Sequence, residues 1–340
     1  MKRLIDWHLE VWRNDERRKP LLLKGARQIG KTYSVRQLGK RFESFVEVNF
    51  ELTPEARTIF EKDLQPERIL WELGLLSRIS ITPGKTLLFL DEVQAAPEAI
   101  LALRYFYELM PNLHVIAAGS LLDFAIEKIG IPVGRVSMLY VYPLSFMEFL
   151  AAAGHGRLIE AVLTQQPLSE ILHNELMDLV GHYLLIGGMP EVVKAWIETK
   201  DPRASYEAQR GLIETYRQDF PKYAKRHQIP YLEILFHQIQ HFIGKQFKYS
   251  AVHGEYKKRE LAPCLHLLKS ANVVHQVTHS AGHGLPLGAQ VNLERFKLIS
   301  LDVGISQALL GLDLATWFLN PDKDFVNRGP IAEAFVGQEL

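Results

Sequence analysis

The chain has 340 residues, of which 47% are hydrophobic and 23% are charged, and its 39 basic and 39 acidic residues cancel. This length predicts two or three globular domains, and the balanced charge argues against a chain that binds polyanions over its whole surface. The only cysteine, Cys264, excludes an internal disulfide and suits a reducing compartment. The charged first residues do not resemble a signal peptide, and no run of about 18 apolar residues predicts a membrane span, so we expect a cytoplasmic protein without a membrane partner.

The first 150 residues alternate between predicted strands and helices. Residues 1–19 predict an amphipathic helix with Leu4, Trp7, Leu9 and Trp12 as its apolar positions. The strands that follow are expected at 20–24, 45–50, 86–91, 113–118 and 136–142. Helices are expected at 31–42, in two pieces within 54–80, at 97–109 and at 121–127. This alternation predicts an α/β core with a parallel sheet, in which ligands bind beyond the carboxyl ends of the strands.

The most informative motif lies directly after the first strand. The sequence GARQIGKT fits the pattern of a phosphate-binding loop, and its residues are Gly25, Ala26, Arg27, Gln28, Ile29, Gly30, Lys31 and Thr32. Glycines allow backbone N–H groups to turn inward around a polyphosphate, and the helix that follows directs its positive end at the same anion. Lys31 is expected to contact the outer phosphates, and the Thr32 hydroxyl is expected to bind Mg²⁺. The motif predicts binding of a nucleoside triphosphate.

A second motif, LLFLDE, ends the third predicted strand. An acid at the end of a buried strand that faces a phosphate loop is typical of a Mg²⁺ ligand, so we assign Asp91 to the metal. The adjacent carboxylate points in a different direction, and we assign Glu92 to the attacking water. The alternative is a pair of solvated acids at a strand end, and the phosphate loop argues against it.

Three further polar residues have open interpretations. Ser120 follows the strand LHVIAA and could contact the γ-phosphate or the water, or could cap the next helix. Arg135 precedes the last strand and could stabilise negative charge in its own subunit or in a neighbouring one, or could be an ordinary surface arginine. Lys24 is interpreted as the polar end of the first strand.

The pattern changes after residue 150. Residues 151–227 predict helices interrupted at 187-GGMP-190, which would form a helical lid. Residues 228–300 predict two helices, 231–243 and 258–270, followed by a two-stranded hairpin, which is the element order of a winged helix. Pro263 restricts where the second of these helices can start. Residues 301–340 form the last predicted segment.

Basic residues are concentrated in the C-terminal half. Residues 200–299 carry 15 Lys and Arg against 8 Asp and Glu. Lys257, Lys258 and Arg259 open the predicted second helix of the winged helix, and duplex DNA is the partner that such a surface would bind. A second basic cluster lies at 222–226. The alternative is a charged, solvated face.

Two histidines, His237 and His241, lie one helical turn apart, as in some zinc sites. The sequence offers no evident third ligand, and a partly exposed helix face explains them more simply. Cys264 lies on an apolar helix face and is interpreted as a core residue.

Several of these motifs together resemble a large prokaryotic family of AAA+-type ATPases, related to the archaeal and signal-transducing ATPases. The stretches that carry the resemblance are GARQIGKT, LLFLDEVQ, AAGSLLDF, GRV followed by YPLSFMEFL, LIGGMPEVV and YRQDFPKY. They cover nearly the whole chain in the expected order, and PLSFMEFL and GGMPE are the most specific. The resemblance implies an ATPase core joined to a C-terminal domain of unassigned function. It supports the roles given above for Lys31, Thr32, Asp91 and Glu92, and it implies a winged-helix segment around 228–300.

The resemblance also implies a nuclease-like fold after a segment such as 329-GPIAEAFVGQEL-340. Glu333 or Glu339 would belong to its opening helix, but the further acid and lysine of a nuclease site are not in this sequence. We therefore expect no complete nuclease site in this chain.

The sequence as a whole predicts a Mg²⁺- and ATP-dependent protein that hydrolyses ATP slowly. One alternative is a nucleotide-gated binding switch that acts on a protein partner with little turnover, either as a monomer or as an oligomer. A small-molecule kinase is less consistent with the paired Asp91 and Glu92, and no element typical of guanine recognition is found.

Overall fold

A computed structural model describes residues 1–165, 167–312, 314 and 328–340. The chain divides into two compact units, an N-terminal unit (Lys2–Val141) and a C-terminal unit (Tyr142–Leu340), to which Met1 is also assigned. Each unit is described by itself. Within the described residues, no helix combines the length and the apolar character that a bilayer crossing requires.

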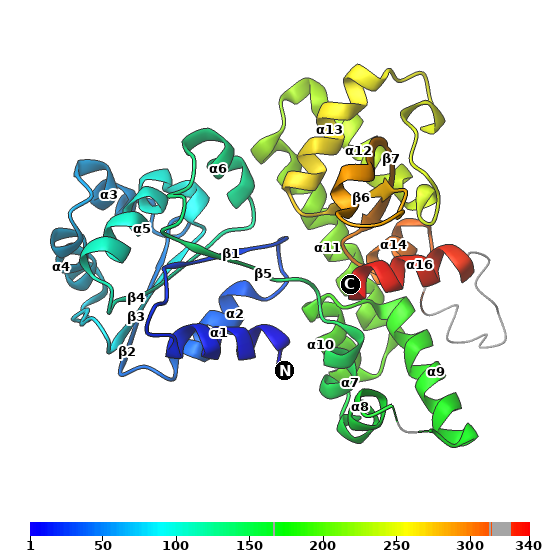
Figure 1. Ribbon diagram of the computed structural model, residues 1–340, viewed down its shortest axis with the longest axis horizontal. Coiled ribbons are helices and arrows are strands. Elements are labelled where there is room, and N and C mark those ends of the chain that lie inside the picture. Colours follow the sequence, from blue (N-terminus) through cyan, green and yellow to red (C-terminus); the bar gives the residue numbers. More distant parts are fainter. Residues whose placement is uncertain (166, 313, 315–327) are drawn as a thin grey trace. The chain divides into compact units, whose positions relative to one another are not determined.

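The N-terminal unit contains a five-stranded parallel sheet in the order β2-β3-β4-β1-β5 (Figure 1). The strands are β1 (Leu21–Lys24), β2 (Ser44–Asn49), β3 (Thr86–Asp91), β4 (His114–Ala118) and β5 (Ser137–Tyr140). Strand β1 lies between β4 and β5, so the chain that leaves β1 is flanked by the ends of two other strands. The predicted parallel α/β fold is confirmed.

Helices cover both faces of this sheet (Figure 1). They are α1 (Leu4–Asn14), α2 (Lys31–Gly39), α3 (Thr58–Lys62), α4 (Pro66–Ser77), α5 (Pro97–Leu109) and α6 (Leu122–Ile129). Alternate strand residues point to opposite faces, and Leu22, Leu88 and Leu90 join one buried core with residues of α3, α4, α5 and α6. Strands β1, β3 and β4 are fully buried along their length, as expected for a sheet covered on both sides.

The predicted helix at α1 is confirmed, but two of its four predicted apolar positions are exposed. Ile5, Leu9 and Trp12 are buried, whereas Leu4 and Trp7 are exposed, at 61% and 65%. Leu4 and Ile5 are adjacent apolar residues, and the apolar pattern alone does not decide which of them is buried.

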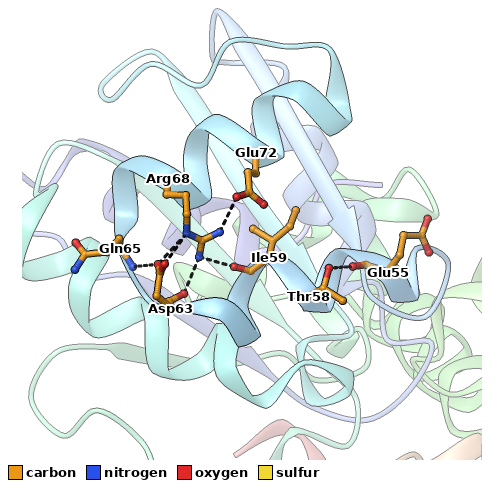
Figure 2. Close-up of polar contacts among 7 residues, drawn as sticks. All are labelled: Glu55, Thr58, Ile59, Asp63, Gln65, Arg68 and Glu72. Carbon is orange, nitrogen blue, oxygen red and sulfur yellow. Dashed lines mark hydrogen bonds and ion pairs between the residues drawn. The ribbon is translucent and has the colours of Figure 1, made fainter.

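A polar cluster fixes the corner between α3 and α4 (Figure 2). The Arg68 guanidinium donates to the Asp63 carboxylate at 2.9 and 3.0 Å, to Glu72 at 2.9 Å and to the carbonyl of Ile59 at 2.7 Å. Asp63 also accepts from the backbone N–H of Gln65 just before α4 begins. A planar guanidinium that satisfies carboxylates and carbonyls together holds this connection between β2 and β3 in one geometry.

The C-terminal unit is mainly helical and carries one antiparallel hairpin. The elements before the hairpin are α7 (Phe146–Ala152), α8 (Gly156–Leu163), α9 (Glu170–Ile186), α10 (Pro190–Thr199), α11 (Pro202–Tyr223), α12 (Ile229–Gln238) and α13 (Lys258–Ser270). The hairpin consists of β6 (Val274–Ser280) and β7 (Val291–Ser300), and α14 (Val303–Leu309) and α16 (Arg328–Glu339) follow. Pro263 lies inside α13 and does not set its start. The order of α12, α13, β6 and β7 is the predicted one, while the winged-helix assignment and the domain boundaries remain predictions.

The glycine pair between α9 and α10 marks a close approach of backbones. A Cβ on Gly188 would lie 2.0 Å from the carbonyl oxygen of Leu144, and one on Gly187 would lie 2.1 Å from Asp302 Oδ1. Asp302 is completely buried and accepts from the N–H groups of Gly188 at 2.6 Å and Ile305 at 2.9 Å, so it also caps α14. The GGMP stretch is therefore a packing junction of the C-terminal unit.

The last helix, α16, is tied to the same unit by a buried polar network. Glu339 accepts from the backbone N–H of Phe146 at 2.9 Å and from the Tyr183 hydroxyl at 3.3 Å, and Gln338 donates to that hydroxyl at 2.7 Å. Glu333 pairs with Lys297 of β7 at 2.6 Å. Both acids that the sequence suggested for a nuclease-like helix have structural partners here.

Candidate active site

The phosphate loop, residues 25–32, connects β1 to α2 at the carboxyl edge of the sheet. Gly25 has φ of 135°, and a Cβ there would lie 2.2 Å from the carbonyl oxygen of Val141. Gly30, directly before α2, has φ of 93°. Glycine is required at position 25 because the chain there passes against the residue that follows β5. It is favoured at position 30 because the backbone there is left-handed. The loop therefore places backbone groups at the N-terminus of α2, where anions bind readily.

Lys31 is the first residue of α2, and its side chain folds back over the loop. Its Nζ donates to the carbonyl oxygens of Gly25 at 2.9 Å and Ala26 at 2.7 Å, and only 7% of the residue is exposed. Burial lowers the pKa of Lys31 to about 8, although the nearby charges of Glu92 and Asp91 oppose the shift. A buried ammonium with carbonyl partners and no direct counter-ion in its hydrogen-bond shell suits an incoming phosphate.

Thr32 and Asp91 meet across α2 and β3. The Thr32 hydroxyl donates to Asp91 Oδ2 at 3.0 Å, and the Asn49 amide at the end of β2 donates to the same oxygen at 3.2 Å. Burial raises the pKa of Asp91 to about 6, with the charge of Glu92 as the second cause. Asn49 was missed by the sequence analysis, although a polar residue at a strand end beside the LLFLDE strand is the signal that would have identified it.

Glu92 has a left-handed backbone, with φ of 51°. Gln94 donates through Nε2 to Glu92 Oε2 at 2.6 Å. A strained backbone at a residue with no glycine-like freedom is a feature of functional positions. Gln94 was not singled out from the sequence, because its role depends on the turn after β3 (η2, Val93–Ala95).

Ser120 lies just after β4, at the same edge of the sheet as the phosphate loop and the end of β3, and it is 6% exposed. Three residues later, Asp123 in the first turn of α6 pairs with Lys24, the last residue of β1. Burial opposes the charged form of Lys24, but hydrogen bonds to Asp123 and Tyr140 outweigh it, and the pKa of Lys24 is raised. Lys24 is therefore a buried ion-pair residue that links the start of the phosphate loop to the segment after Ser120, and the interpretation as a simple strand end is wrong.

Arg135 lies at the opposite edge of the sheet. It precedes the amino end of β5, which runs parallel to β1, and its Nε donates to Glu108 near the C-terminus of α5 at 2.7 Å. The expectation that Arg135 lies near the phosphate site of its own subunit is wrong, because a residue before a parallel strand is a full strand length from the carboxyl edge. A role across an interface between subunits stays a prediction.

Arg3 connects the N-terminal helix to the phosphate loop. Its guanidinium donates to the carbonyl oxygen of Ile29 at 3.1 Å, and the residue is 9% exposed. This contact lies within the N-terminal unit and attaches the residue before α1 to the phosphate loop. The sequence did not suggest it, since the two residues are 26 positions apart.

The donors present fit Mg²⁺ and a nucleoside triphosphate. A hydroxyl and a carboxylate within 3.0 Å of each other are the oxygen ligands that Mg²⁺ takes from protein, together with substrate phosphates. The glycine-lined loop and the Lys31 ammonium provide N–H donors and positive charge for the phosphates. Thr32 and Asp91 would hold the metal.

Lys257, Lys258 and Arg259 are exposed at the N-terminus of α13 in the C-terminal unit. Cations are unfavourable at this end of a helix, because the helix dipole is positive there. Two of them have local contacts: the Lys258 ammonium lies 5.9 Å from the centre of the Tyr249 ring, and the backbone N–H of Lys257 donates to Glu260. In the second basic cluster, Lys222 pairs with Asp219 at 3.0 Å.

Comparisons with known proteins agree with this geometry. Residues 17–150 match the family described as "AAA domain", and residues 177–316 match one described as "Domain of unknown function". The N-terminal unit is a P-loop ATPase domain of the AAA type. The AAA domain model ends close to the predicted end of the core, and the second model spans most of the C-terminal unit.

One of the similar solved structures shows the same fold at low identity. A Walker-type ATPase of Pyrococcus abyssi matches with a TM-score of 0.56 and 18% identity over 90% of this chain and 94% of the other. The Cdc6 protein of Pyrobaculum aerophilum matches with a TM-score of 0.33 and 16% identity over 91% and 93% of the two chains. The second score is too low to support an argument, and the first supports the fold alone. No curated protein matches the sequence.

Proposed function

We propose that this protein binds Mg²⁺-ATP and hydrolyses it slowly by attack of water on the γ-phosphate. The observation that carries the proposal is the meeting of Thr32 and Asp91 at 3.0 Å beside the buried Lys31 ammonium. Lys31 and Thr32 begin α2, and Asp91 ends β3, 59 positions from Thr32 in the sequence. A phosphate with its metal ion needs this combination of cation, hydroxyl and carboxylate.

The roles of the residues follow from their chemistry. Backbone N–H groups of residues 25–32 and the Lys31 ammonium bind the phosphates, and Mg²⁺ held by Thr32 and Asp91 would neutralise charge on the phosphate oxygens. Glu92 accepts a proton from water as the water oxygen bonds to the γ-phosphorus. The bond from that phosphorus to the β–γ bridging oxygen breaks, which releases phosphate and ADP. Ser120, at the tip of β4, is placed to donate a hydrogen bond to the γ-phosphate.

The experiment that tests this function measures phosphate release and ATP affinity for the wild type and Glu92→Gln. We expect release from the wild type and a loss of at least about 100-fold in kcat for the variant, because general-base assistance typically contributes 10²–10⁴-fold. The affinity for ATP should stay within about twofold, since glutamine keeps the shape of the side chain. If the wild type binds ATP and releases no phosphate, the proposed hydrolysis is wrong and the nucleotide-gated switch is supported in its place.

We also infer that the C-terminal unit directs this ATPase to duplex DNA. The supporting observation is the group of three exposed cations at the N-terminus of α13, where phosphate would gain from both the side chains and the helix dipole. Lys245, Lys248 and Arg295 add exposed positive charge elsewhere in the segment between α12 and the end of β7. A basic surface of this kind binds DNA through phosphate contacts that weaken with salt.

The test replaces Lys257, Lys258 and Arg259 together with Glu and measures duplex affinity over a range of salt concentrations. Loss of three phosphate contacts should reduce the slope of log K against log [salt] by about 3. Charge reversal of Lys222, which pairs with Asp219, is the matched control and should have a smaller effect. Unchanged affinity and salt slope in the triple variant would remove DNA from the proposal and leave the ATPase in place.

A further inference from the structure

Gln94 lies between the proposed general base and the tip of β4. Its Nε2 donates to Glu92 Oε2 at 2.6 Å. Its Oε1 lies so close to Gly119 that a Cβ on this glycine would be 2.1 Å away. Gly119 directly precedes Ser120, so the Gln94 side chain joins two of the segments that surround the proposed phosphate site.

The orientation of the Gln94 amide follows from chemistry. An ionised carboxylate only accepts hydrogen bonds, so the amide nitrogen must face Glu92 and the amide oxygen must face the β4 tip. That oxygen is buried and has no hydrogen-bond partner among the described residues. A buried acceptor without a donor is unfavourable, and such groups in native proteins call for an explanation.

An attacking water supplies the missing donor. Water carries two O–H groups, and its lone pair is directed at a phosphorus only when both O–H groups are held by acceptors. Glu92 provides one acceptor, and Gln94 Oε1 provides a second at the same edge of the sheet.

We propose that Gln94 is a further catalytic residue, which holds the Glu92 carboxylate through Nε2 and accepts a hydrogen bond from the attacking water through Oε1. This inference rests on the proposed hydrolysis of ATP. In the reaction the proton that leaves the water goes to Glu92, while the hydrogen bond to Gln94 keeps the second O–H group directed away from the phosphorus. Gln94 neither gains nor loses a proton.

Gly119 allows a second, independent test of the proposal. A methyl group at this position would occupy the place of Gln94 Oε1. The backbone of Gly119 is not among the positive-φ glycines, so alanine is allowed by its conformation. Gly119→Ala should therefore act mainly by displacing the Gln94 side chain from Glu92.

The test compares kcat and ATP affinity for Gln94→Leu and Gln94→Glu with the wild type. Leucine removes both polar atoms, and glutamate removes the N–H group and places a second carboxylate beside Glu92. Both variants should lower kcat by about 10- to 100-fold. Their affinity for ATP should stay within about twofold of the wild type, because Gln94 is proposed to contact the attacking water and not ATP. Gln218→Leu, the same change at an exposed glutamine of α11, is the matched control and should leave kcat unchanged.

A double-mutant cycle separates this role from a purely structural one. Gly119→Ala should lower kcat in the wild type but change it by less than about twofold in a Gln94→Ala background, where the added methyl group has room. Equal losses in both backgrounds would show that Gly119 acts without Gln94 and would contradict the contact.

The outcomes for the two proposals are distinct. A wild type that hydrolyses ATP, together with a Gln94→Leu variant that keeps more than half of kcat, would overturn the role of Gln94 alone. A wild type that binds ATP and releases no phosphate would overturn hydrolysis and, with it, the water that Gln94 is proposed to hold.

Discussion

Asp91 in the N-terminal unit and Asp302 in the C-terminal unit are both buried, and burial raises the pKa of each to about 6. Their partners differ. Asp91 Oδ2 accepts from two side chains, Thr32 and Asn49, which can rearrange around a metal ion, and Asp91 Oδ1 accepts from the backbone N–H of Glu92 at 3.1 Å. Asp302 accepts from the backbone N–H groups of Gly188 and Ile305, which are fixed by the packing of α9, α10 and α14.

This comparison shows that a displaced pKa does not by itself identify an active site. The same desolvation acts on a carboxylate poised for a ligand and on one that holds a structural junction. What separates them is that Asp91 has side-chain hydroxyl and amide partners at the carboxyl end of a sheet, whereas the hydrogen bonds to the Asp302 carboxylate come from backbone groups inside a packed core. Substitutions that affect chemistry should therefore cluster around Asp91, and those that affect stability around Asp302.

The largest expected effect is on turnover. Asp91→Asn should lower phosphate release by at least about 100-fold, because the amide cannot supply the negative charge that Mg²⁺ requires. The free energy of unfolding should change by less than about 1 kcal/mol, since the change also removes a buried charge. Urea denaturation and phosphate release on the same samples check both statements, and a loss of stability in place of activity would make Asp91 resemble Asp302.

Lys31→Ala should weaken ATP binding by about 30- to 100-fold. A charge-assisted contact to phosphate contributes about 2 to 3 kcal/mol, and the alanine side chain leaves the loop carbonyls of Gly25 and Ala26 without the ammonium. Equilibrium binding of a fluorescent ATP analogue measures the effect. Lys40→Ala, at the exposed residue directly after the same helix, is the control and should bind as the wild type does.

Asp302→Ala should destabilise the protein by about 2 to 4 kcal/mol, because two buried backbone N–H groups lose their acceptor. Asp201→Ala is the matched control, since Asp201 caps α11 in the same way but is exposed, and its loss should lower stability by about 1 kcal/mol. ATP affinity should stay unchanged in both variants. Equal destabilisation by the two would contradict the role assigned to burial.

The smallest expected effect is a pH dependence in the N-terminal unit. Burial, assisted by the charge of Arg18, lowers the pKa of His114 to about 4, and its ring lies edge-on to Trp12 and Phe42. The unfolded chain takes up the proton near pH 6.5, so the stability contributed by neutral His114 is complete above that pH and is lost as the pH falls towards 4.

Between pH 7 and pH 5 this loss should amount to about 1 to 2 kcal/mol. His114→Phe removes the titrating group, and its stability should fall less steeply over the same interval. Thermal unfolding at several pH values measures the difference. Parallel curves for the wild type and the variant would show that His114 does not titrate on unfolding.

Much of this protein could be predicted from local sequence. The strand LLLK, the loop GARQIGKT and the strand LLFLD predicted the parallel sheet and named Thr32 and Asp91, which the fold brings within 3.0 Å of each other, because strand burial and the loop's glycines depend on neighbouring residues in the chain. The bounds of α5 and α13 were also predicted, since their apolar spacing is regular.

Other features were decided only by the tertiary structure. The sequence could not show that Arg135 lies at the wrong edge of the sheet, that Lys24 is buried against Asp123, or that Gln94 reaches Glu92. Strand order and the turn after β3 set these distances, and both depend on how segments far apart in the chain pack together. The proposed phosphate-binding residues could be named from the sequence because one loop supplies most of them, whereas the residues proposed to orient a water come from several segments and meet only in the fold.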